Sequence, residues 1–408
     1  MFVGGMRYSI SRRMALGTSA VAILIAGCAG TVETQSASGN QGQLGPGVPA
    51  FQVRPGYRVD IAANNIQNAR FLEFDDKGTL FVGIPRSGEI LSLEDTNGDG
   101  VYDKRETYIS AKPTVHGMHF KDGWLWFTQT QAIHKARDTN GDGKADEVIT
   151  VIPESELPGG GGHWWRPILV TDSHIYTGVG HSGNIKDETD TERQKIWRFN
   201  LDGTGKSLYA TGIRNTEKLR LRPGTNEIWG CDHGSDWFGA PLGEREKGKQ
   251  PVTDLQPPCE FNHYVEGGFY GHPFIVGDKL PRIEYHDRPD ILNLAEKTIP
   301  PAWKLGAHWA PNGFCFATTD TLGPDHKGDA FIAFHGSWNS TVKVGYRIER
   351  ILFDEVTSKP YGSLSIVTTI TDNQEVLARP VDCLEAPDGT LLWSCDYSHR
   401  VYRVSKAN

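Results

Sequence analysis

Residues 212–234 carry polar groups whose types and spacing could hold an anion. Arg214 and Asn215 stand at the start of one apolar segment, and Asp232 and His233 stand at the end of the next, after a turn at 222–226. Both ends of such a hairpin lie at one rim of a β-fold, where binding residues are commonly placed on a rigid scaffold. Arg offers a planar fork suited to carboxylates, and Asn offers an amide. We therefore expect an anionic cofactor at this rim.

His163 is a candidate general base. It follows four consecutive glycines at 159–162. An imidazole titrates near neutrality, which suits a group that accepts a proton during a reaction. It is also one of fourteen histidines, and it is followed by Trp164 and Trp165. On residue type alone, a packed histidine beside these indoles is the commoner outcome.

The elements that must position these groups repeat along the chain. From residue 51 onward, an apolar strand is followed by a polar turn and then by a second strand rich in aromatic and aliphatic residues. The second strands begin at residues 80, 125, 175, 228, 330 and 391, so the first steps are 45, 50 and 53 residues. Repeats of this size are typical of propeller blades. We predict an all-β fold, a six-bladed β-propeller of four-stranded antiparallel blades.

Two further features complete the expected propeller, which would span residues 51–408. The early strand at 57–62 could join the last blade and leave no open edge. A long insertion at 235–310 precedes the fifth copy of the repeat, and it would shape the substrate pocket.

The N-terminus has the pattern of an export signal. Basic residues at 7, 12 and 13 precede an apolar run at 14–26, and Ile25-Ala26-Gly27-Cys28 follows. The run is too short to span a membrane. It resembles a bacterial lipobox, with residues 1–27 removed and Cys28 lipidated, and Ser11-Arg12-Arg13 more weakly resembles a twin-arginine signal. Residues 28–50 read as a flexible tether. We expect a periplasmic lipoprotein that touches the membrane through its anchor only.

Composition limits the partners and the redox chemistry. The net charge of −8 gives no basic footprint for nucleic acid. Export would place the remaining five cysteines in an oxidising compartment. Cys383 and Cys395 flank a turn, so a disulfide between them is plausible. A disulfide between Cys231 and Cys259 is a second hypothesis, which would leave Cys315 free. The sequence does not fix the connectivity.

A separate motif predicts a calcium loop. The spacing Asp-x-Asn-x-Asp-Gly-x₅-Glu puts oxygen ligands at the EF-hand positions, without flanking helices. These ligands are Asp95, Asn97, Asp99, Asp103 and Glu106. A second copy starts at Asp138 but has Ile149 at the twelfth position, so it should bind more weakly. A polar β-turn is the alternative interpretation of both.

Several phrases in a fixed order carry a family resemblance. They are GGHWWRP at 161–167, GIRN at 212–215, DHG at 232–234, PPCEFN at 257–262, GGFYGHP at 267–273, APNGF at 310–314 and HGSWN at 335–339. From about residue 52 onward the chain resembles the soluble sugar dehydrogenases that depend on pyrroloquinoline quinone (PQQ), especially the L-sorbosone and pyranose dehydrogenase branch.

The resemblance implies a role for each candidate residue. His163 would be the general base, while Arg214, Asn215, Lys343 and Arg379 would bind PQQ. The backbone carbonyls of Gly234 and Ser235 would bind the Ca²⁺ that accompanies the cofactor. Ser235 departs from the Pro that soluble glucose dehydrogenases of the family have at this position.

Glu217 is a second departure, because it stands where the family often has Gln. A carboxylate facing an anionic cofactor would repel it unless Glu217 is protonated, points away or contacts the metal.

The implied reaction is oxidation of an aldose or aldosone at C1. Hydride would pass to PQQ, polarised by Ca²⁺, and electrons would pass to an external quinone or haem acceptor such as a cytochrome. Two other classes stay open: a propeller without cofactor that acts as a carbohydrate-binding or assembly module, and a metal-dependent lactonase.

Overall fold

The computed structural model describes residues 41–239 and 251–407. By its contacts Asn40–Asn408 forms one compact unit, and everything below concerns that unit. The predicted signal peptide at 1–27 and the lipidation site Cys28 lie outside the described residues. Within the described ranges, no helix is long and apolar enough to cross a membrane.

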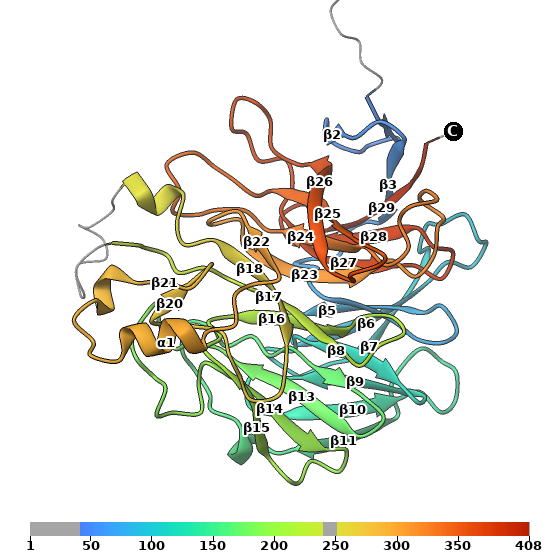
Figure 1. The fold of residues 1–408 in the computed structure, drawn as a ribbon. Coiled ribbons are helices and arrows are strands. Elements are labelled where there is room, and N and C mark those ends of the chain that lie inside the picture. Colours follow the sequence, from blue (N-terminus) through green and yellow to red (C-terminus); the bar gives the residue numbers. More distant parts are fainter. Residues whose placement is uncertain (1–40, 240–250, 408) are drawn as a thin grey trace, which may run out of the picture. The chain divides into compact units, whose positions relative to one another are not determined.

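Apart from the two-stranded sheet of β20 (Ile275–Val276) and β21 (Leu280–Pro281), the described chain forms six mainly antiparallel sheets that follow one another in sequence, which confirms the predicted six-bladed propeller (Figure 1). The sheets hold four or five strands each, whereas we predicted four throughout. The first blade consists of β4 (Leu72–Phe74), β5 (Leu80–Ile84), β6 (Glu89–Glu94) and β7 (Lys104–Ile109). The second consists of β8 (Met118–Lys121), β9 (Trp124–Thr128), β10 (Ile133–Arg137) and β11 (Glu147–Ile152). The third consists of β12 (Leu169–Val170), β13 (His174–Val179), β14 (Lys195–Asn200) and β15 (Ser207–Thr211), with β19 (Gly268–Phe269) added in parallel. The fourth blade consists of β16 (Thr216–Leu221), β17 (Ile228–Asp232), β18 (Cys259–Tyr264) and β22 (Trp303–Leu305). The fifth consists of β23 (Pro311–Phe316), β24 (Ala330–Phe334), β25 (Arg347–Phe353), β26 (Pro360–Thr368) and β2 (Gln52–Val53). The sixth consists of β27 (Pro380–Glu385), β28 (Leu391–Cys395), β29 (Arg400–Lys406), β3 (Tyr57–Ala63) and β1 (Gln43–Leu44).

The ring closes in two ways. The first strand of each blade contacts the first strand of the next, from β4 through β8, β12, β16, β23 and β27 back to β4. The early strand β3 pairs antiparallel with the final strand β29, as predicted, so the chain's two ends share one sheet. β1, which pairs with β3, lies inside the range 28–50 that we expected to be a flexible tether.

The apolar core lies between the blades. Six buried clusters each draw side chains from two neighbouring blades, for example Phe261 and Phe314 between the fourth and fifth. The second strand of each blade is buried on both faces, as in the five fully buried residues of β5, β24 and β28. This explains why these strands read as continuous apolar runs rather than alternating ones.

The segment at 235–310 is more than a surface insertion. It supplies β18 and β22, the third and fourth strands of the fourth blade, and β19, which extends the third. Its other elements are η2 (Pro251–Asp254), β20 (Ile275–Val276), β21 (Leu280–Pro281), η3 (Ile283–Tyr285) and α1 (Ile291–Lys297), while η1 (Glu154–Glu156) lies elsewhere, after β11.

The proposed disulfides are wrong, because all five described cysteines are buried free thiols. In the register of β27 and β28, Cys383 lies opposite Trp393 and Cys395 lies opposite Pro380. Between β17 and β18, Cys231 lies opposite Phe261. Near-symmetry about a turn therefore did not place the sulfurs together, because the register that starts at the turn pairs Cys383 with Trp393, two residues short of Cys395.

Candidate functional site

A cavity of about 300 Å³ lies at the end of the ring where the first strands of the blades begin and the second strands end. It brings together six of the residues predicted for the cofactor site: His163, Arg214, Asn215, Glu217, Gly234 and Arg379. They come from three blades, the third, fourth and sixth, and are separated by up to 216 positions in the chain. The expectation that both ends of one hairpin lie at a common rim therefore holds for several blades, whose predicted site residues all lie at this end of the ring.

Asp232 fixes the Arg214–Asn215 pair. Its two carboxylate oxygens accept the backbone N–H groups of Arg214 at 2.9 Å and Asn215 at 2.5 Å. The Arg214 guanidinium is then oriented by the side chains of Asn184 at 3.0 Å and Asp236 at 3.1 Å. The hairpin thus holds both side chains at the cavity before any ligand arrives.

His163 lies at the cavity with its ring oriented by one hydrogen bond. Its Nδ1 lies 2.8 Å from the carbonyl oxygen of His181. A carbonyl only accepts, so Nδ1 donates and Nε2 of the neutral ring keeps its lone pair. Burial, with a further contribution from the positive Arg214, lowers the pKa of His163 well below its usual value. The ring is therefore neutral at pH 7 and able to accept a proton.

A glycine makes room for this histidine. A Cβ on Gly180 would lie 2.8 Å from the Cβ of His163 and 3.0 Å from the carbonyl oxygen of Arg214. Only a residue without a side chain lets the third blade bring these two predicted site residues so close.

Glu217 is buried, with 3% of its surface exposed, and it faces Arg70. One carboxylate oxygen lies 3.1 Å from the Arg70 guanidinium, and the other accepts the Asn215 amide at 3.2 Å. Burial alone would raise the pKa of Glu217, but the bond to His116 and the charge of Arg70 lower it well below its ordinary value. Of the three alternatives open from the sequence, the pair with the Arg70 guanidinium favours an ionised carboxylate over a protonated one.

Arg70 is a site residue that the sequence analysis missed. Its guanidinium also pairs with Asp396 at 2.9 Å and stacks 4.4 Å from the Trp165 ring, while its buried Nε has no partner. Arg70 precedes β4 by two residues, as Arg214 precedes β16, and Arg379 directly precedes β27. The same position of the blade repeat therefore carries an arginine three times, a signal that aligning the repeats could have found.

Lys343 is not brought into the cavity, so its predicted role is corrected. Its Nζ donates to the carbonyl oxygen of Gln374 at 2.8 Å, in an exposed setting. His335, which opens the same HGSWN motif, lines the cavity instead and bonds Asp396 at 3.0 Å. Arg379, the other loosely aligned candidate, does line the cavity and donates through Nε to the carbonyl of His335 at 3.1 Å.

Gly234 lies where the second strand of the fourth blade runs out. A Cβ there would come within 2.8 Å of the Pro258 carbonyl oxygen and 2.9 Å of the Pro257 carbonyl oxygen, so only Gly fits. Ser235 is buried beside it, and its hydroxyl donates to the Trp237 carbonyl at 2.9 Å. Backbone carbonyl oxygens are ligands that Ca²⁺ accepts, and those of Gly234 and Ser235 are the ones predicted to bind it.

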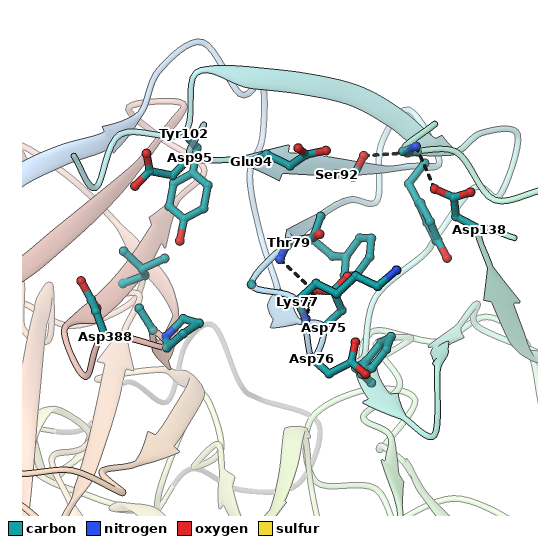
Figure 2. Close-up of a pocket in the computed structure, with 18 of the residues that line it drawn as sticks. Asp75, Asp76, Lys77, Thr79, Ser92, Glu94, Asp95, Tyr102, Asp138 and Asp388 are labelled. Atoms are coloured by element: carbon teal, nitrogen blue, oxygen red, sulfur yellow. Dashed lines mark hydrogen bonds between the residues drawn. The ribbon is translucent and has the colours of Figure 1, made fainter. Parts of the chain in front are cut away.

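The two Asp-rich loops lie at the other end of the ring, away from this site. They border a cavity of about 620 Å³ formed around the turns that join first to second strands, with Asp95 and Asp138 on its opposite sides (Figure 2). Asp95 accepts the backbone N–H groups of Gly98 and Gly100 at 2.8 and 2.7 Å. Asp138 accepts those of Gly141 and Gly143 at 2.7 and 2.8 Å.

The predicted calcium loop is not assembled as an EF-hand. Glu106, which should complete it, lies on β7 and pairs with Lys144 at 3.3 Å. Asp103 bonds Thr96, and Asn97 caps the N–H of Asp99 at 2.9 Å. Within residues 41–239 and 251–407, no three His, Cys, Asp or Glu side chains gather as a metal would require. The described contacts are those of polar turns, the alternative interpretation, and calcium binding by either loop stays a prediction.

The central cavity suits a planar anion with several carboxylates. Three arginines and three amides line it against two acidic side chains, and both acids already bond an arginine. The Nε of Arg70 and the Oδ1 of Asn215 are buried without a partner. Buried polar atoms without partners are costly, so a ligand that satisfies them is favoured there.

Comparisons with known proteins agree with this geometry. Residues 286–407 match the family described as TrAA12-like. The PQQ domain of pyranose dehydrogenase from Coprinopsis cinerea, in its holo form, is 17% identical with a TM-score of 0.76, over 89% of this chain and 100% of that one. The calcium structure of the Trichoderma reesei family AA12 enzyme is 18% identical with a TM-score of 0.75, over 91% and 100%. At these identities the likeness confirms the fold, which is the fold of the family that the motifs resemble.

A relative by sequence and a second family match extend over the rest of the chain. An uncharacterized protein of Borreliella burgdorferi is 24% identical over 369 residues, which are 87% of this chain and 90% of the relative. Residues 47–264, more than half of the chain, match DUF7133, a domain of unknown function. The chain therefore belongs to the DUF7133 family, with a TrAA12-like match over its C-terminal blades.

Proposed function

We propose that this protein is a PQQ- and Ca²⁺-dependent dehydrogenase that oxidises an aldose or aldosone at C1 to a lactone or acid. The observation that carries the proposal is the meeting, in one cavity of about 300 Å³, of a neutral imidazole with a lone pair and three arginines from three blades. The motif order and the likeness to a pyranose dehydrogenase PQQ domain support the same cofactor.

Each residue would then have a definite task. Arg70, Arg214 and Arg379 would bind the carboxylates of PQQ, with Asn215 adding its amide. Glu217 would hold Arg70 in place rather than touch the cofactor, because its oxygens are already bonded. PQQ, when bound, would supply an ortho-quinone that accepts hydride, and Ca²⁺ held near the carbonyls of Gly234 and Ser235 would polarise it.

His163 would act on the substrate itself. Its free Nε2 would take the proton from the C1 hydroxyl of the sugar while the Nδ1–H stays bonded to His181. Because its depressed pKa keeps the ring neutral, no prior deprotonation is needed at pH 7. Protonation at lower pH would remove the lone pair and with it the activity.

The cellular setting is part of the proposal. The basic and apolar segment before Cys28 favours export and a lipid anchor, with electrons passed to a quinone or a haem protein. In that setting the sugar would be oxidised outside the cytoplasm.

The test is a titration of the purified protein with PQQ, with and without Ca²⁺, followed by dye reduction with a panel of aldoses and aldosones. His163→Gln is the matched variant. It should bind PQQ as the wild type does and lose about 10²- to 10⁴-fold in kcat/KM, the usual contribution of a general base.

Three other results would each overturn the proposal. A variant with full activity would remove His163 from the chemistry. Failure to bind PQQ would favour a carbohydrate-binding or assembly module. Hydrolysis of lactones without PQQ would indicate a lactonase.

A further inference from the structure

Trp338 is held out into water at the mouth of the central cavity. It lines that cavity, yet 71% of its surface is exposed. It belongs to the HGSWN motif, in the connection between β24 and β25. A large indole left in water loses the hydrophobic stabilisation that burial would give. Exposed aromatic surface beside a ligand cavity is where binding sites are found.

The exposure is imposed by the fold rather than by a loose connection. The Ser337 N–H donates to the Val344 carbonyl at 2.9 Å, and the Tyr346 hydroxyl donates to the Ser337 carbonyl at 2.6 Å. On the far side of Trp338, the Thr341 N–H donates to Asp254 at 2.9 Å. The backbone is thus fixed on both sides of the indole, so Trp338 is presented in one place.

A second indole stands next to it. The Trp237 ring lies 5.9 Å from the Trp338 ring at an interplanar angle of 82°, an edge-to-face contact between residues of two different blades' connections. Its own backbone is fixed because the Trp237 carbonyl accepts from Ser235 at 2.9 Å and from Arg282 at 2.7 Å. The contact orients the Trp338 ring while leaving most of its surface open.

Polar groups flank this pair. Asp236, directly before Trp237, lines the cavity, and its Oδ1 pairs with Arg214 at 3.1 Å. Asn339, directly after Trp338, lines the cavity and donates its amide N–H to the Asp236 carbonyl. An apolar face bordered by a carboxylate and an amide matches a sugar ring, which has a C–H face and hydroxyl groups at its edge.

We propose that Trp338 and Trp237 form a ledge on which the ring of a cyclic sugar stacks, with Asp236 and Asn339 reaching its hydroxyls. The inference rests on the proposed function and adds to it a preference for pyranose-sized substrates. Ligand pockets of drug-sized molecules occupy about 300–1,000 Å³, so a cavity at the lower limit holds the cofactor and leaves the sugar at the mouth. The mouth is where Trp338 lies.

The experiment compares Trp338→Ala and Trp338→Phe with the wild type, all loaded with PQQ and Ca²⁺. Substrates are D-glucose and maltose as cyclic sugars and glyceraldehyde as a small acyclic control. Trp338→Ala should raise KM for the cyclic sugars by roughly threefold to tenfold, the range expected for one aromatic contact. KM for glyceraldehyde and kcat should stay unchanged, and Trp338→Phe should recover most of the loss.

Tyr361→Ala is the matched control. Tyr361 is 63% exposed on β26, an outer strand of the same blade, so its loss tests whether any exposed aromatic affects KM. It should not. Equal KM values for Trp338→Ala and the wild type on the cyclic sugars would overturn the ledge, although the dehydrogenase itself would stand.

A second measurement separates the two proposals. Calorimetric titration of the protein with maltose, without cofactor, reports sugar binding directly. If PQQ fails to bind, the proposed function fails, while heat of maltose binding that is lost in Trp338→Ala still supports the ledge. Equal binding by both proteins, or no binding by the wild type, counts against it.

Discussion

At the scale of single residues, the site is a chain of paired charges rather than a set of separate groups. Asp396 connects His335 and Arg70, and Arg70 connects Asp396 and Glu217. Burial would raise the pKa of Asp396, yet the bond to His335 and the charge of Arg70 lower it to about 2. One guanidinium thus neutralises two carboxylates, and its Nε stays available for a ligand.

Arg70→Gln tests this arrangement. Loss of a charge-assisted bond to an anionic ligand should weaken PQQ binding by roughly tenfold or more. It should also lower the melting temperature, because Glu217 would be left as a buried charge without its cation. Both are measured on the purified protein, by titration with PQQ and by calorimetric melting.

The control for Arg70 is Arg58→Gln, which removes a partly exposed pair with Asp60 far from the cavity. It should change neither PQQ affinity nor, by more than about 1 kcal/mol, the free energy of unfolding. Unchanged PQQ affinity in Arg70→Gln would remove Arg70 from the cofactor site.

At the scale of elements, the propeller depends on one strand from the far end of the sequence. β3 completes the last blade by pairing with β29, where Val59 lies opposite Val404. Val59 is fully buried in the cluster between the fifth and sixth blades. Without β3, the last blade would present an open edge, and the apolar clusters on both sides of that blade would lose the buried side chains of β3.

Val59→Asp should therefore lower the free energy of unfolding by about 3–5 kcal/mol, because it buries an unpaired charge in that cluster. Urea unfolding followed by circular dichroism measures it. Asp60→Asn, the next residue on the opposite face of the strand, should change it by no more than about 1 kcal/mol. Similar stability of the two variants would show that closure through β3 contributes little.

At the scale of the whole molecule, many histidines are buried in the neutral state. Burial lowers the pKa of His116, His119, His163, His233, His272 and His335, and it lowers that of His134 to about 4. Five carboxyl groups act in the opposite direction: burial raises the pKa of Glu73, Asp329 and Glu349, that of Asp232 to about 6 and that of Glu260 to about 8. The histidines outnumber them.

Stability should consequently fall as the pH decreases from about 6.5 to about 4. Below 6.5, the ordinary value, histidines of the unfolded chain take up protons that the folded protein does not, so acid favours unfolding. Urea unfolding at a series of pH values measures the slope. His134→Gln should make the slope of the free energy of unfolding against pH shallower between about pH 6.5 and about pH 4, because one group fewer takes up a proton on unfolding. A free energy of unfolding that rises toward pH 4 would contradict the argument.

The sequence by itself determined the repeat, the closure and the position of the cavity. In a propeller each blade is a local meander, so the period of the strands fixes the blades, and residues before each first strand must lie at the same end of the ring. The period predicts the blades, and the Arg214–Asn215 hairpin predicts the end of the ring where the cavity of about 300 Å³ lies. His163, Glu217, Gly234 and Arg379 lie there for the same reason.

Only the tertiary structure decided which side chains meet across the ring. Arg70 and Glu217 are 147 positions apart, and their contact depends on how far each blade reaches toward the axis. Lys343 carries the right charge near the right motif, but its connection turns it to Gln374. The cysteines follow a strand register that a turn does not reveal. Distances between blades come from packing, and local spacing does not encode them.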